Sequence, residues 1–89
     1  MKSINILNDY VILEVWAFEV QIIKEDLEYI LIKHYKYSLN EYIDRDVDED
    51  GFVNYSISLI NVPFEELYDA IYCAIIYDNL KYSIKTKTL

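Results

Sequence analysis

The stretch FVNYSISLI at residues 52–60, which runs on into NVPFEELYDAIYCAIIY at residues 61–77, decides the fold class of this chain of 89 residues. Every second residue of the first stretch is apolar and the residues between are mostly Asn or Ser, which predicts a strand with one buried face. The second stretch has apolar residues at helical spacing, so we predict a helix that packs on a sheet, capped by Asn61 with Pro63 in its first turn and ending at Asp78-Asn79. A strand that leads into such a helix indicates an α+β protein.

The flanking segments extend this pattern to one domain over residues 1–89. Residues 80–89 alternate again and predict a closing strand with a solvent face that carries Lys81, Lys85 and Lys87. Residues 10–23 are rich in β-branched and aromatic side chains, and we predict one long strand, with a bulge that shifts the alternation between Glu14 and Glu19. A buried helix is the alternative for this segment.

Two helices are expected between these strands. Residues 25–37 fit an amphipathic helix, and residues 38–41 (SLNE) fit a capping box that begins a short helix. The predicted fold is therefore a sheet of about three strands packed against two main helices and a short one, in the order β-α-α-β-α-β. If the last two strands are parallel neighbours, the helical crossover between them should be right-handed.

Negative charge is concentrated in one part of the chain. Residues 38–79 hold ten of the sixteen carboxylates and a single basic residue, Arg45, so this segment carries a net charge of −9 while the remainder is close to neutral. A concentrated negative field attracts basic surfaces and repels nucleic acid and anionic membranes. We therefore expect a basic protein as the partner, with no direct contact to nucleic acid and no membrane contact.

The composition argues against catalysis. Gly51 is the only glycine, whereas loops that bind phosphates or dinucleotides need several. His34 and Cys73 fall on predicted helices with no oxyanion-hole sequence beside either, so we expect no catalytic pair, no enzyme activity and no cofactor. We expect a cytoplasmic location for three reasons. The lone cysteine fits a reducing compartment, no apolar run reaches the roughly 20 residues of a membrane span, and polar residues near the N-terminus interrupt what would be the apolar part of a secretory signal.

One segment resembles the first half of an EF-hand calcium loop. Asp46, Asp48 and Asp50 stand at the first, third and fifth positions, and Gly51 follows at the turn position. The twelfth position, where that family has a bidentate Glu, is Ile57. A divalent-cation-binding structural domain is therefore the alternative function, with Asp46, Asp48 and Asp50 as ligands, and a plain turn into the following strand is the competing interpretation.

The function that these patterns favour is that of a non-enzymatic inhibitor or neutraliser, which occupies a basic, nucleic-acid-handling surface of another protein. Immunity proteins, antitoxins and anti-restriction or anti-CRISPR proteins are of this kind. Tyrosines are common at such interfaces, and Tyr37, Tyr42 and Tyr77 are expected to be exposed. Open strand edges also allow a homodimer. The expected partner-binding residues are Asp44, Asp46, Asp48, Glu49, Asp50, Glu65, Glu66, Asp69 and Tyr42.

Overall fold

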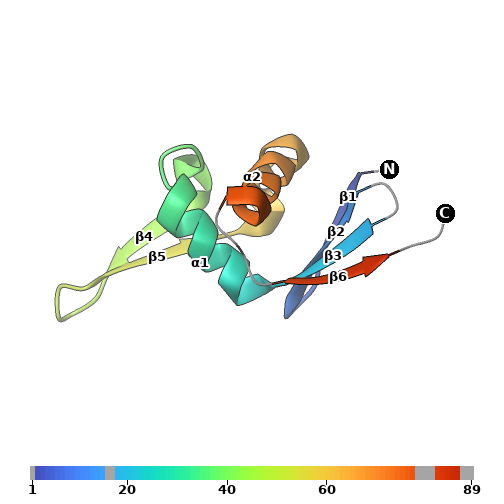
Figure 1. Ribbon diagram of the computed structural model, residues 1–89. Helices are drawn as coiled ribbons and strands as arrows, with labels where there is room; N and C mark the ends of the chain where they lie inside the picture. The colour runs from blue at the N-terminus through green and yellow to red at the C-terminus, as the bar shows by residue number, and fades with distance from the viewer. Residues whose placement is uncertain (1, 16–17, 78–81, 87–89) are drawn as a thin grey trace.

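The computed structural model describes residues 2–15, 18–77 and 82–86, and it confirms an α+β fold (Figure 1). The main sheet is antiparallel, with the strand order β1-β2-β3-β6. A second, two-stranded antiparallel sheet is a hairpin of β4 and β5. The elements are β1 (Ser3–Ile6), β2 (Tyr10–Val15), β3 (Phe18–Ile23), α1 (Lys24–Tyr35), the 3₁₀ turn η1 (Asn40–Tyr42), β4 (Ile43–Val47), β5 (Val53–Ile57), the 3₁₀ turn η2 (Leu59–Asn61), α2 (Phe64–Tyr77) and β6 (Tyr82–Thr86).

The two helices lie between the main sheet and the hairpin, and the hairpin extends from the far side of the helices (Figure 1). The molecule is elongated, with extents of 51 × 24 × 21 Å. No helix in the described part of the chain is long and apolar enough to span a membrane.

A continuous apolar core joins the inner face of the main sheet to both helices. The alternation of β2 and β3 directs every second side chain towards α1 and α2, and the root of the hairpin closes the core from the other side. The most deeply buried side chains are Val11, Leu13, Ile22, Leu27, Leu31, Ile71 and Ala74.

The prediction of one bulged strand over residues 10–23 is wrong. The segment forms two antiparallel strands, β2 and β3, in which Glu14 lies opposite Glu19 and Val15 opposite Phe18. The change of alternation between the two glutamates therefore comes from the pairing of two antiparallel strands, since residues directly opposite each other share one face of the sheet.

The predicted order β-α-α-β-α-β is correct in part: the two long helices and the strands β5 and β6 are present where they were expected. Besides the split at residues 10–23, the strands β1 and β4 were not predicted. The last two strands are not parallel neighbours, because β5 pairs with β4 and β6 pairs antiparallel with β3, so there is no parallel crossover between them.

The helix-start predictions also need correction. The hydroxyl of Ser38 donates to the carbonyl of Tyr35 at 3.2 Å, back towards α1, and so does not cap η1. Asn61 lies within η2, and it is the carbonyl of Pro63 that accepts the N–H of Leu67 in the first turn of α2.

At the C-terminus, the predicted strand is present as β6, Tyr82–Thr86. The expected helix end at Asp78-Asn79 and the predicted solvent-facing lysines Lys81 and Lys87 lie outside the described residues.

Candidate functional site

The β4–β5 hairpin carries five of the ten carboxylates of residues 38–79 on an exposed arm (Figure 1). Every residue from Asp44 to Ser56 is exposed, and burial begins only at the root, where Ile57 is 7% exposed. A hairpin that packs one face on the core shows alternating burial, so exposure of both faces leaves this one available for binding. The acidic residues 44–50 thus lie partly on β4 and partly in the turn that follows it.

The two faces of the hairpin differ in chemistry. Asp44 lies opposite Ser56 and Asp46 opposite Asn54, so one face is polar and negatively charged. The other face carries Tyr55 opposite Arg45, with Val47 opposite Val53 nearer the tip. On this second face the Nζ of Lys36, just after α1, lies 4.9 Å from the centre of the Tyr55 ring, a cation–π contact that steadies the hairpin against the helix.

The tip is a tight turn built by Asp48 and Gly51. The N–H of Gly51 donates to the carbonyl of Asp48 at 3.1 Å, and Gly51 has φ of 86°, which other residues rarely adopt. The Asp48 carboxylate accepts the N–H groups of Asp50 at 3.0 Å and Phe52 at 2.9 Å. Asp48 therefore shapes the turn, and Glu49 and Asp50 remain as its outward charges.

A second acidic group lies on α2. Glu65 and Glu66 stand in its first turn, where the helix dipole favours carboxylates, and Asp69 follows on the next. Glu66 and Asp69 lie at a hollow of about 300 Å³ between the end of α1 and α2. The other residues that line it are Tyr35, Ser38, Leu39, Ala70 and Cys73.

Tyr42 connects the two acidic groups. Its carbonyl accepts the N–H of Ser58 at 3.4 Å at the hairpin root, and its side chain is half-buried beside Glu66. Desolvation, the charges of Glu66 and Glu41, and a hydrogen bond to Glu66 raise the pKa of Tyr42. Of the three tyrosines expected at the surface, Tyr37 and Tyr77 are fully exposed and Tyr42 is only partly so.

The predicted residues do not form a single cluster. A strand of five residues is about 17 Å long, so the carboxylates at the hairpin tip stand well away from those on α2. Asp46, Asp48 and Asp50 are not brought together either: among the described residues, no three His, Cys, Asp or Glu side chains converge as a metal site would require. The side chain of Ile57, at the twelfth position of the EF-hand-like segment, is buried.

Sequence reasoning missed the apolar part of this arm. Phe52 is 69% exposed beside the turn, and Val47 and Val53 are exposed next to it. The signal was present, because Ile43, Arg45 and Val47 alternate with two aspartates and an Asp-Gly turn separates this run from the next alternating one.

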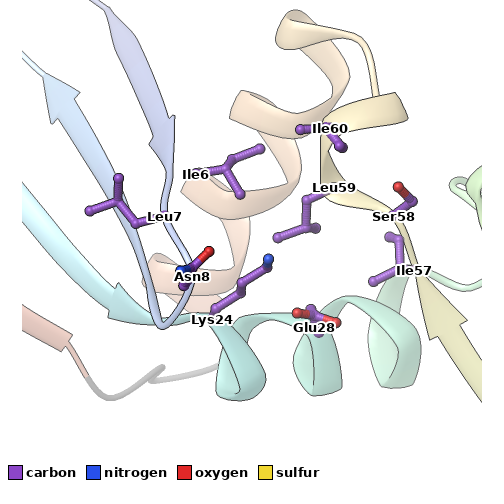
Figure 2. A pocket seen from close by; sticks show the side chains of 9 residues that line it. All are labelled: Ile6, Leu7, Asn8, Lys24, Glu28, Ile57, Ser58, Leu59 and Ile60. Atoms are coloured by element: carbon purple, nitrogen blue, oxygen red, sulfur yellow. The ribbon is translucent and has the colours of Figure 1, made fainter.

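A larger pocket, of about 420 Å³, lies at the hairpin root (Figure 2). It is formed by the β1–β2 turn, the start of α1, and the chain from the end of β5 into η2. Figure 2 shows the side chain of Lys24 directed from α1 towards Leu59. The lining residues are Ile6, Leu7, Asn8, Lys24, Glu28, Ile57, Ser58, Leu59 and Ile60.

Comparisons of the chain with protein-family models, with curated proteins and with solved structures found no match. The geometry and charge of the hairpin and of α2 are therefore the basis for assigning a function.

Proposed function

We propose that this protein is a non-enzymatic binding protein that neutralises a basic, nucleic-acid-handling surface of another protein. The observation that supports the proposal is the exposed β4–β5 arm. Asp44 and Asp46 lie on one face of this arm, and Glu49 and Asp50 are exposed at its tip. Immunity proteins, antitoxins, and anti-restriction or anti-CRISPR proteins have roles of this kind.

The mechanism is competition with phosphates. Residues two apart on a strand are separated by about 6.8 Å and share a face, so Asp44 and Asp46 form a short row of negative charges, as successive phosphates of a nucleic-acid strand do. Asp44 and Asp46 therefore offer charges at a spacing that a row of phosphate-binding Lys or Arg side chains can accept. The pairing would be charge-assisted, and long-range attraction would speed the encounter.

The hollow beside α2 supports a second point of contact. Its floor contains Leu39 and Ala70, while Glu66 and Asp69 supply negative charge. A Lys or Arg side chain has an apolar stem and a charged head, and this combination of surfaces suits both parts. Tyr42, beside Glu66, would then lie at the edge of the interface.

The test is capture of partner proteins from lysate of the cells that make this protein. The immobilised protein is compared with a variant whose outward hairpin charges are removed and whose turn-forming Asp48 is kept. The substitutions are Asp44→Asn, Asp46→Asn, Glu49→Gln and Asp50→Asn. We expect basic proteins to be retained by the native arm, displaced by heparin, and retained at least about tenfold less by the variant.

A matched control removes four carboxylates from the other end of the chain: Asp9→Asn, Glu25→Gln, Asp26→Asn and Glu28→Gln. It changes the net charge equally and should leave capture unchanged. Because the screening length falls from about 10 Å at 0.1 M salt to about 3 Å at 1 M, retention should also be lost at high salt. Equal capture by both variants, or retention that survives 1 M salt, would contradict the proposal.

A further inference from the structure

The β4–β5 sheet has two outer edges, and in the described part of the chain neither is paired with another strand. Such edges present unpaired backbone groups that can pair with another chain. A two-stranded sheet alone is also only marginally stable, so it gains from a further strand. The chemistry of the two edges differs sharply.

The backbone groups that face outward on each strand follow from the hairpin hydrogen bonds. Asp48 donates to Phe52, and Ser58 donates to Tyr42, so the even-numbered residues of both strands bond within the hairpin. The groups of the odd-numbered residues therefore point outward: Ile43, Arg45 and Val47 on β4, and Val53, Tyr55 and Ile57 on β5.

The β4 edge is unsuited to pairing with its own copy. Antiparallel pairing about a twofold axis at Arg45 would set Arg45 opposite Arg45, and Asp44 opposite Asp46, of the two copies. Directly opposite side chains lie about 5 Å apart, where like charges are destabilising. The charge pattern of β4 thus acts against self-association at this edge.

The β5 edge has the opposite character, and we propose that two copies of this chain associate through it. Pairing about a twofold axis at Tyr55 sets Tyr55 opposite Tyr55 and Val53 opposite Ile57. The outward-facing backbone N–H and C=O groups of one copy then lie opposite those of the other and can form hydrogen bonds with them. Between them, Asn54 lies opposite Ser56, and both are neutral. The carboxylates of the two β4 strands are then three strand spacings, about 14 Å, apart, beyond the screening length of about 8 Å at physiological salt.

The same register places an exposed aromatic ring at a pocket. Phe52 of one copy falls opposite Ser58 of the other, and Ser58 lines the pocket of about 420 Å³ at the hairpin root (Figure 2). Ile60, also at the rim of this pocket, is 79% exposed and offers apolar surface for an aromatic ring. Phe52 of each copy packs against the Ser58 and Ile60 rim of the other, so the interface is the same on both sides, as a twofold dimer requires.

The experiment measures molar mass by sedimentation equilibrium over a wide range of protein concentration. The native protein should form a reversible dimer, and Phe52→Ala should raise the dissociation constant by at least about tenfold, as expected when a buried aromatic side chain is removed from an interface. A native protein that is monomeric throughout the range, or a dimer that Phe52→Ala does not weaken, would overturn the proposal.

A charge-exchange pair tests the register itself. N54K/S56K places lysines opposite Asp46 and Asp44 within the hairpin, which preserves the fold, but sets lysine against lysine across the dimer. It should be folded by circular dichroism and monomeric. D44N/N54K/S56E restores opposite charges across the twofold axis and should dimerise again. Asp44→Asn is included because Ser56→Glu alone would set two carboxylates opposite each other within the hairpin. A folded N54K/S56K dimer, or failure of a folded D44N/N54K/S56E variant to recover, would exclude this edge.

Discussion

At the scale of single residues, the carboxylates of the hairpin have unequal roles. Asp48 accepts two backbone N–H groups within the turn, whereas Glu49 and Asp50 project from it. The difference follows from position, because an Asp at the first place of a turn can bond the N–H two residues further on. Charge count alone therefore overstates the number of carboxylates that are available to a partner.

Asp48→Ala should lower the free energy of unfolding by about 1 kcal/mol, the usual size of a lost side-chain cap. Asp48→Asn keeps an acceptor oxygen and should lose less than half as much. Urea denaturation of both variants measures the difference. Equal losses would show that the charge of Asp48, and not its hydrogen bonds, stabilises the hairpin.

The raised pKa of Tyr42 predicts how the stability of the protein changes with alkaline pH. Desolvation and the charge of Glu66 raise its pKa in the folded protein, so the folded state holds the phenolic proton more strongly than the unfolded state does. The resulting stability is fully present below the ordinary tyrosine pKa of about 10 and is lost as pH rises through the raised value.

Tyr42→Phe should therefore reduce the decline of stability with pH in this alkaline range, and Glu66→Gln should lower the pKa of Tyr42. Urea denaturation at a series of alkaline pH values tests the first point, and NMR titration of the tyrosine ring carbons tests the second. An unchanged Tyr42 titration in the Glu66→Gln variant would refute the contribution of Glu66 to the raised pKa.

At the scale of elements, α2 and the hairpin occupy opposite extremes of burial. The inner face of α2 is sealed in the core, whereas the strands of the hairpin are covered only at their root. Sequence periodicity found α2 because its apolar stripe is long and regular. It missed β4 because aspartates have low strand propensity, although the alternation was present.

Ile71 and Ile76, both on α2, make a matched pair for measuring this burial. Ile71 is 0% exposed and Ile76 is 50% exposed. Ile71→Ala should cost about 2–5 kcal/mol of unfolding free energy because it leaves a cavity in the core, and Ile76→Ala should cost about 1 kcal/mol or less. Urea denaturation measures both values, and similar losses would contradict the assigned packing of the helix.

At the scale of the whole molecule, the acidic segment is divided between two places. One part extends on the hairpin and the other stays on α2 against the body, with Tyr42 between them (Figure 1). Under the proposed function, a partner would therefore contact two separate acidic surfaces.

Local periodicity, turn chemistry and composition were enough to predict the α+β class, a helix after the strand at residues 52–60, the turn at Gly51 and the location of the charge. The tertiary structure decided what depends on contacts between distant residues. It divided residues 10–23 into two strands, placed β6 beside β3, and left the β4–β5 hairpin uncovered. Whether a strand face is buried depends on which distant residues of the chain pack against it, and the alternation within the strand does not reveal those residues.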